Sequence, residues 1–353
     1  MKILVINPGS TSTKIGVYED TNLLWKKNIH HDSDHLKQFA GIAGQYPYRK
    51  ELILSELRAE GFSSDDFRAV IGRGGLLSPL QGGVYAVNEK MIDELKHATR
   101  EHASNLGAIL AYDIAAAIDG CMAFIADPVV VDELDDVARV SGLPGLPRVS
   151  IFHALNHKAI AHRYARDMGR KYEELDLIVV HMGGGISVGA HRHGRVIDVN
   201  NALDGEGPLS PERAGTLPAG QLVDLCFSGN YDKAEIKKMI SGKGGMVAHL
   251  GTNDARVAED AALAGDAKAR LINEAMIYGV AKLVGSMFVV LGCHADAILL
   301  TGGMAHSDYL TGMLRSYVGS LAPIVIYPGE DELGALAENA YNALTGAYEV
   351  KVY

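Results

Sequence analysis

Runs of apolar residues separated by short polar stretches predict the first elements of the chain. Residues 3–7 (ILVIN) and 14–20 (KIGVYED) flank a loop of small polar residues, a pattern typical of a β-hairpin. Residues 177–199 (LIVVHMGGGISVGAHRHGRVIDV) repeat the order of strand, glycine-rich turn, strand, turn and strand. We therefore expect a β-hairpin at the start of the chain and a second one near its middle.

The two hairpins align with each other. Matching Asn7 with His181 places Gly9 on Gly183, an offset of 174 positions that is close to half of the chain. A repeat at this distance indicates an internal duplication at the scale of a domain.

Helical periodicity and buried strands fill the remaining segments. Asn88 is suited to cap a helix that carries Met91, Ile92 and Leu95 on one face. Further helices are expected over 105–118, 154–168 and 261–290 and from Glu332, and buried strands over 123–134, with a break at Asp127, and over 297–305. Strand-rich and helix-rich segments alternate in each half, so the predicted class is α/β.

Composition narrows the possible functions. A chain of 353 residues with 48% hydrophobic and 22% charged residues is expected to form two domains and not to be disordered. Its net charge of −10, with thinly spread Lys and Arg, disfavours a nucleic-acid surface. Three widely spaced cysteines and short apolar runs, the most apolar of the later ones over 283–293, suggest neither a disulfide framework nor a membrane span. We expect a cytoplasmic protein.

The domain boundaries follow from the loop at 141–148 (SGLPGLPR), whose glycines and prolines make it the candidate hinge. We expect an N-terminal lobe of residues 1–145 with 332–353 and a C-terminal lobe of residues 146–331.

The first hairpin tip offers small hydrogen-bond donors. Residues 9–13 (GSTST) supply backbone N–H groups and hydroxyls, and Lys14 adds a positive charge. These groups suit phosphate oxygens, although small polar residues also form ordinary turns. Neither hairpin follows the P-loop or the GxGxxG spacing, so P-loop and Rossmann proteins are disfavoured.

Five ordered motifs carry a resemblance to a known family. They are NPGSTSTK (7–14), HMGGG (181–185), PERAG (211–215), NDAR (253–256) and LTGGM (300–304). Together they resemble the acetate kinase family, in its butyrate kinase branch, which belongs to the actin, Hsp70 and sugar-kinase superfamily. The resemblance implies two duplicated actin-like (ribonuclease H-like) domains with a nucleotide cleft between them, and a homodimer or higher homo-oligomer. It implies reversible phosphoryl transfer from ATP to butyrate or a branched acid such as isobutyrate, with ADP as product and Mg²⁺ as cofactor.

The chemistry of that reaction explains the kind of residues involved. A carboxylate is already deprotonated at neutral pH, so no general base is required. The site must instead bring an anion to a polyanion, which calls for cations and hydrogen-bond donors. Arg73, Arg213 and His181 are of the right type and lie beside glycines. In the family, an arginine and a histidine at the positions resembling Arg213 and His181 contact the transferred phosphoryl group.

The resemblance implies further roles motif by motif. It assigns the first phosphate and metal loop to Asn7, Gly9, Ser10, Ser12 and Lys14, and the second phosphate loop to Gly183, Gly184 and Gly185. His102 would line the acid site and Asp132 would support the arginines. The adenosine site would hold Asp254, Arg256, Gly302 and Gly303, and the metal would be held by Asn7 and Glu332, with Asp331 or Glu330 as alternatives if the register shifts.

Several alternatives stay open. Asp132 and His102 could cap helices, Asp254 and Arg256 could form a surface ion pair, and Lys14 could point to solvent. His153 and His157 have the i, i+4 spacing of a zinc pair, but packing is favoured because no glutamate follows the first histidine.

The rival functions are a sugar kinase of the same superfamily, with Asp198 or Asp204 as base, and a non-catalytic ATPase switch. The preferred acid depends on the volume of the pocket, for which Val180 and Pro208 are candidate walls.

Overall fold

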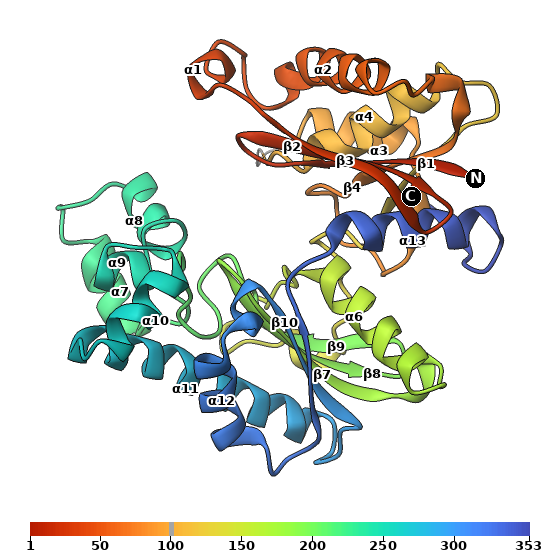
Figure 1. Cartoon of the computed structure of the whole chain (residues 1–353). Helices are drawn as coiled ribbons and strands as arrows, with labels where there is room; N and C mark the ends of the chain where they lie inside the picture. Colours follow the sequence, from red (N-terminus) through yellow and green to blue (C-terminus); the bar gives the residue numbers. More distant parts are fainter. Residues whose placement is uncertain (99–101) are drawn as a thin grey trace. The chain divides into compact units, whose positions relative to one another are not determined.

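The chain folds into two compact units (Figure 1), seen in a computed structural model that describes residues 1–98 and 102–353. Unit 1 comprises Met1–Val131 and Asp331–Tyr353, and unit 2 comprises Asp132–Glu330. The first boundary therefore lies before the expected one, and residues 141–148 belong to unit 2. Their role as a hinge stays a prediction.

Unit 1 is built on a seven-stranded sheet with the strand order β12-β5-β6-β4-β1-β2-β3. Its strands are β1 (Lys2–Pro8), β2 (Ser12–Glu19), β3 (Asn22–His30), β4 (Phe67–Arg73), β5 (Val84–Ala86), β6 (Met122–Ala126) and β12 (Val350–Val352). The first three strands are antiparallel neighbours, whereas β4 runs parallel to β1 and β6 parallel to β4. The parallel pairs place the ends of β1 and β4 at one edge of the sheet.

Helices cover both faces of this sheet (Figure 1), with α4 on one face and α13 on the other. The helices are α1 (Ser33–Leu36), α2 (Tyr46–Ala59), α3 (Glu89–Lys96), α4 (Asn105–Ala115) and α13 (Glu332–Leu344). The glycines in α4 and β4 bring the two together, because a Cβ atom on Gly72 would lie 2.0 Å from the carbonyl oxygen of Gly107. This close approach fixes the path of the chain after Arg73.

Unit 2 contains a five-stranded sheet with the order β11-β10-β7-β8-β9. Its strands are β7 (Asp176–Met182), β8 (Ile186–Arg192), β9 (Arg195–Val199), β10 (Ala297–Gly302) and β11 (Ile324–Pro328). Successive residues of β7 are buried on opposite faces, Leu177 and Val179 in one core and Ile178 and Val180 in the other. Burial on both faces explains why the apolar run shows no polar alternation.

The helices of unit 2 lie on both sides of that sheet. Residues of α6 pack in the core that contains Leu177, and residues of α11 and α12 pack in the core that contains Ile178. The helices are α5 (Asp136–Arg139), α6 (Ala154–Asp167), α7 (Ala219–Cys226), α8 (Lys233–Ile240), α9 (Met246–Leu250), α10 (Ala255–Leu263), α11 (Ala267–Val290) and α12 (Asp308–Val318).

Helix α11 is long and apolar enough to cross a membrane by length and composition. The inward stripe of this helix includes Met276, Val280 and Val284, which are fully buried in the core of unit 2. Spacing of three to four residues between buried positions is that of a core helix in a globular domain.

The two units repeat one topology. The strand β7 spans 176–182 and β1 spans 2–8, which reproduces the offset of 174 positions. In both units an antiparallel three-stranded meander is followed by two strands parallel to its first strand, β4 and β6 in unit 1 and β10 and β11 in unit 2. The predicted duplication and the α/β class are confirmed.

Most predicted elements form where expected, with local differences. Asn88 caps α3 by accepting a hydrogen bond from Met91 N, as expected. The expected helix over 261–290 is two helices, because Asp266 caps the start of α11 after a break. The strand β12 was not predicted.

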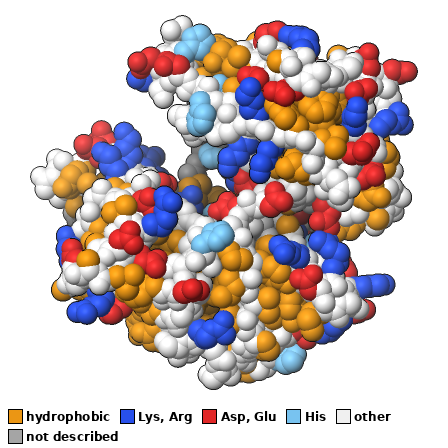
Figure 2. All heavy atoms as spheres, in the orientation of Figure 1, with side chains coloured by type: hydrophobic (Ala, Val, Ile, Leu, Met, Phe, Trp, Pro, Cys, Tyr) orange, Lys and Arg blue, Asp and Glu red, His pale blue; other side chains and the backbone are white. Residues whose placement is uncertain are grey.

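On the face shown in Figure 2, acidic and basic side chains are interspersed, in agreement with the thin spread of Lys and Arg along the chain.

Candidate active site

The first hairpin tip in unit 1 exposes backbone donors. Gly9 N donates to Ser12 O at 2.7 Å and closes the turn between β1 and β2. Ser10 and Thr11 are exposed, and among the described residues no acceptor faces their backbone N–H groups. Lys14 is exposed on β2. These groups are available to an anion, as the sequence predicts.

Three predicted residues meet at the edge of the unit 1 sheet. Asn7 at the end of β1 donates from Nδ2 to Glu332 Oε2 at 2.5 Å, and Arg73 Nη1 lies 3.2 Å from Glu332 Oε1. Glu332 begins α13, so residues from the two ends of the chain lie in contact. Asn7 is buried, and the Glu332 side chain is 17% exposed. The cluster therefore combines two side chains that can supply oxygen ligands, Asn7 and Glu332, with one cation, Arg73.

His102 lies at the start of α4. Its Nδ1 lies 2.7 Å from Ser104 Oγ and accepts from Ser104 N at 3.2 Å. Ser104 is the N-cap residue of α4, so this contact places His102 at the helix start, as the capping alternative predicts. The nearby Asn105 Oδ1 accepts from Leu76 N at 2.8 Å and holds the loop that follows Arg73.

The second hairpin tip in unit 2 packs against the loop that carries Arg213. Ser210 Oγ donates to Gly184 O at 2.8 Å, and Arg213 Nη1 donates to Ala202 O at 2.5 Å. A Cβ atom on Gly185 would lie only 1.8 Å from Arg213 Nη1. The glycine at 185 is therefore what allows the guanidinium to lie against the tip.

His181 near the end of β7 is held between two acceptors. Its Nδ1 lies 2.8 Å from Asn156 Oδ1, and its Nε2 lies 3.2 Å from Glu330 Oε1. Both oxygens accept hydrogen bonds, so each ring nitrogen of His181 faces an acceptor. The ring of His153 stacks on it with centroids 3.8 Å apart.

A buried chain of polar groups extends from His153 into the core. Ser187 Oγ lies 2.8 Å from both His153 Nδ1 and His157 Nε2. His157 Nδ1 lies 3.2 Å from His191 Nε2, and His191 Nδ1 lies 2.7 Å from the Tyr172 hydroxyl. Burial holds the pKa of both His157 and His191 well below 6.5. The buried rings of His157 and His191 are therefore neutral. His153 and His157 form the hydrogen bonds that the packing interpretation predicts. The described residues contain no group of three metal-ligating side chains.

Asp132 is an ion-pair residue in unit 2. Its Oδ2 lies 2.5 Å from Arg139 Nη1, and its Oδ1 accepts from Leu134 N at 3.3 Å. The hydrogen bond to Asp132 raises the pKa of Arg139. The arginine that Asp132 supports in the structure is thus Arg139.

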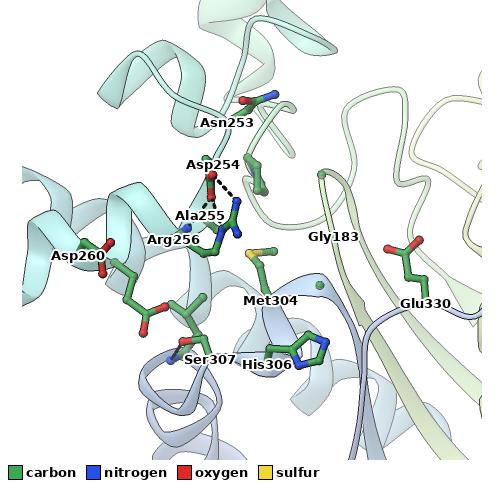
Figure 3. A pocket seen from close by; sticks show the side chains of 15 residues that line it. Gly183, Asn253, Asp254, Ala255, Arg256, Asp260, Met304, His306, Ser307 and Glu330 are labelled. Carbon is green, nitrogen blue, oxygen red and sulfur yellow. Dashed lines mark hydrogen bonds and ion pairs between the residues drawn. The ribbon is translucent and has the colours of Figure 1, made fainter. Parts of the chain in front are cut away.

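A cavity of about 920 Å³ in unit 2 contains several of the predicted nucleotide residues (Figure 3). Gly183 and Gly184 line it from the hairpin tip, and Asp254 and Arg256 line it from the start of α10. Gly303 lines it from the short 3-10 helix η4 (Gly303–His306). A volume of this size suits a small-molecule cofactor.

Asp254 and Arg256 form an ion pair at the rim of this cavity. Arg256 Nη2 lies 2.8 Å from Asp254 Oδ2, and the hydrogen bond from the arginine side chain lowers the pKa of Asp254. The carboxylate also caps α10 by accepting from Arg256 N. The two residues thus form the ion pair that the alternative predicts, and both also line the cavity.

Gly302 ends β10 with φ +89°, and a Cβ atom there would lie 2.4 Å from Met182 O. Only glycine fits this close approach in this conformation. The turn that follows can then enter η4 beside the second hairpin.

Other lining residues were not anticipated in that role. They are Pro211, Asn253, Ala255, Glu259, Asp260, Met304, His306, Ser307, Leu310 and Glu330. Asn253 Nδ2 donates to Glu212 Oε1 at 2.7 Å, which joins the NDAR and PERAG segments. For most of them, a position within or beside the PERAG, NDAR and LTGGM motifs is the sequence signal that could have indicated this role, and Glu330 was named only as an alternative metal ligand.

Comparison with known proteins decides the family. A family model described as the acetokinase family matches residues 146–311. A protein of Bacteroides thetaiotaomicron named "Probable butyrate kinase" is 57% identical over 353 residues, covering 100% of both chains. "Butyrate kinase 2" of Clostridium acetobutylicum is 54% identical and covers 100% of this chain and 99% of its own. The chain belongs to the acetokinase family.

The fold agrees with this membership. The crystal structure of Porphyromonas gingivalis acetate kinase superposes with a TM-score of 0.78 at 19% identity, covering 96% of this chain and 98% of that one. The likeness shows a common fold. The resemblance drawn from the five motifs is therefore confirmed for the acetokinase family, together with the duplicated actin-like architecture.

Proposed function

We propose that this chain is a butyrate kinase, which transfers the γ-phosphoryl group of ATP to the carboxylate of butyrate or a short branched acid. The observation that carries the proposal is full-length identity of 57% and 54% to relatives whose names state butyrate kinase. A carboxylate oxygen forms a bond to the γ-phosphorus, the bond from phosphorus to the ADP oxygen breaks, and ADP leaves. The reverse reaction forms ATP on the same groups.

The charges of the two units support this chemistry. No base is needed because the acid is already ionised, so catalysis rests on positioning and on positive charge near the transferred group. We assign this charge to Arg213, His181 and Arg73. Both ring nitrogens of His181 face an oxygen acceptor, and Arg213 lies against the second hairpin tip. His102 is assigned a supporting role near the acid, and Asp132 is assigned a supporting role near the arginines.

ATP and ADP are proposed to bind both hairpin tips. The phosphates would meet Gly9, Ser10, Ser12 and Lys14 in unit 1, and Gly183, Gly184 and Gly185 in unit 2. The adenosine would occupy the 920 Å³ cavity lined by Asp254, Arg256 and Gly303, and Gly302 directly precedes Gly303 in the chain. Backbone N–H groups without protein acceptors at Ser10 and Thr11, within the described residues, support phosphate binding at the first tip.

Asn7 and Glu332 fit a Mg²⁺ ion. Mg²⁺ takes oxygen ligands and is commonly held by one or two carboxylates together with substrate phosphates. The amide of Asn7 and the carboxylate of Glu332 already lie in contact, and the carboxylate is partly exposed. Bound Mg²⁺ would neutralise phosphate charge. Arg73 also holds the Glu332 carboxylate in place.

We also propose that the enzyme works in the cytoplasm as a homodimer or higher homo-oligomer. Cys121, Cys226 and Cys293 are free thiols, which suits a reducing compartment. Size-exclusion chromatography with light scattering would test the oligomer, and a monomer at micromolar concentration would contradict it.

The activity is tested by incubating the protein with ATP and Mg²⁺ and each of acetate, propionate, butyrate, isobutyrate and glucose. Acyl phosphate is trapped with hydroxylamine while ADP is measured in parallel. Hydroxamate formed with four-carbon acids above acetate supports the proposal. ADP formed with glucose alone would point to a sugar kinase. Asp198, a candidate base for that reaction, already forms an ion pair with Arg148 at 2.8 Å. ADP release that ignores every acceptor would point to an ATPase switch.

A further inference from the structure

A guanidinium lies fully buried beneath the first hairpin tip. Arg49 is 0% exposed and lies on α2, in the inward stripe that continues with Ile53 and Leu57. Arginine is rarely buried to this extent unless its charge is paired. The position therefore calls for an explanation.

The hydrogen bonds of Arg49 converge on the loop. Nη1 donates to Gly9 O at 2.8 Å and to Ser12 O at 3.1 Å, and Nη2 donates to Ser10 O at 3.0 Å. The remaining loop carbonyl, that of Thr11, accepts from His31 N at 2.9 Å. All four carbonyls of residues 9–12 are thus engaged by protein donors.

This arrangement orients the loop. With the carbonyl groups committed to Arg49 and His31, the backbone N–H groups of Ser10 and Thr11 are left without an acceptor among the described residues. Consecutive N–H groups of this kind form an anion-binding concavity. Arg49 therefore determines which side of the peptide groups faces a ligand.

The other partners of Arg49 are neutral. Thr13 Oγ1 accepts from Nη1 at 3.1 Å, and Gln45 Oε1 accepts from Nε at 3.2 Å and from Nη2 at 2.8 Å. Among the described residues no carboxylate forms an ion pair with Arg49. Burial lowers the pKa of Arg49 to about 10, so the group stays charged at neutral pH. It lies close enough to His31 to help lower the pKa of that histidine to about 4, after the larger effect of burial.

We propose that Arg49 is a positioning residue for the phosphates of the nucleotide: it orients the loop 9–12 and leaves its positive charge unneutralised beneath it until an anion binds. The inference rests on the proposed function for the identity of the nucleotide, but the anion site itself does not. A buried charge without a counter-ion is unfavourable in the free protein, and a bound phosphate supplies the missing partner.

The decisive variant is Gln45→Glu. It keeps the shape and the acceptor of residue 45, which is 6% exposed, and places a carboxylate against Arg49. Ion pairing inside the protein should leave the thermal midpoint unchanged or higher while removing the charge that a phosphate would otherwise meet. A purely structural role for Arg49 predicts no loss of anion affinity in this variant. The matched control is Gln38→Glu, which makes the same charge change at an exposed position nearby.

Binding of inorganic pyrophosphate is measured by calorimetry, and KM values by the hydroxamate assay. We expect Gln45→Glu to weaken pyrophosphate binding and to raise KM for ATP about ten- to hundredfold, the range of the interaction between two unit charges several ångströms apart at the effective dielectric constant of a protein, with KM for butyrate changed less than about twofold. Arg49→Met, which keeps an apolar stem, should act in the same direction where it folds. Gln38→Glu should bind pyrophosphate as the wild type does.

The outcomes separate the two proposals. Gln45→Glu that binds pyrophosphate and ATP as Gln38→Glu does, or a wild type that binds no pyrophosphate, overturns the role of Arg49. A wild type that binds pyrophosphate with the expected sensitivity but phosphorylates no acid supports that role and refutes the butyrate kinase activity instead.

Discussion

Acid should destabilise unit 2 through the two histidines at the centre of its buried polar chain. His157 and His191 are 0% exposed, and His157 Nδ1 lies 3.2 Å from His191 Nε2. A hydrogen bond between two ring nitrogens needs a lone pair on one of them, so this contact requires an unprotonated nitrogen. Burial, reinforced by neighbouring charges, holds both pKa values well below 6.5.

The sign and size of the effect follow from linkage. Because the folded-state pKa is lower than that of the unfolded chain, the contribution to stability is complete above about pH 6.5 and is lost progressively as the pH falls below it. Below that pH, each histidine lowers the free energy of unfolding by about 1.4 kcal/mol per pH unit. Acidification to about pH 5 removes roughly 2 kcal/mol per residue, or about 4 kcal/mol for the pair, a large share of the about 5–15 kcal/mol typical of a domain.

The test is urea unfolding of the whole chain, followed by far-UV circular dichroism over a series of pH values from about 5 to 8. His157→Gln keeps a side chain that can donate and accept, and it should lower the slope of unfolding free energy against pH by about 1.3 kcal/mol per pH unit near pH 5, which is one proton. The exposed His97→Gln serves as the control. Trp25, the single tryptophan, lies in unit 1 and reports that unit separately. An unchanged slope in a folded His157→Gln protein would refute the neutral, buried assignment.

Three further results are expected. Arg213→Ala should lower kcat several hundredfold or more, since one donor to a developing charge is worth about that factor; retained turnover in the hydroxamate assay would remove Arg213 from the site. Gly185→Ala should lower kcat, because its Cβ would displace the flexible end of the Arg213 side chain. For the same reason it should change the unfolding free energy by less than about 1 kcal/mol. Equal kcat in variant and wild type would show that catalysis does not depend on the position of the guanidinium against the hairpin tip. Glu332→Gln, which loses a carboxylate beside Asn7 and Arg73, should raise the Mg²⁺ concentration needed for half-maximal rate about tenfold or more; an unchanged Mg²⁺ titration would contradict its role as a ligand.

The sequence predicts those features that depend on local patterns. Alternating and continuous apolar runs located both hairpins, and the cap at Asn88 located α3, because each signal is confined to a few neighbouring residues. The offset of 174 positions held to the residue for β1 and β7, since the strands at the sheet centre have fixed lengths and the glycine turns follow them directly. The break between α10 and α11 was missed because Asp266 reads equally well as an exposed helical residue.

The long-range features could not be obtained in this way. Val180 was a candidate pocket wall, yet it is 0% exposed in the core of unit 2, because both faces of β7 are covered. Arg49 and Arg58 look alike in the sequence of one helix, but the first is buried under the loop 9–12 and the second forms an exposed ion pair with Glu51. Only the packing of α2 distinguishes them.

The internal repeat gives the two units equivalent backbone positions, but residues with different chemistry occupy them. Asn7 and His181 occupy equivalent places in their strands, and each contacts a glutamate near the junction of the two units in the chain, Glu332 for Asn7 and Glu330 for His181. An amide beside a carboxylate offers oxygen ligands, whereas an imidazole offers ring nitrogens that can donate hydrogen bonds. Under the proposed function, the same strand end would hold a metal in unit 1 and contact a phosphoryl group in unit 2. Exchanging the two residues should therefore abolish both roles, although the sheets that carry them have the same topology.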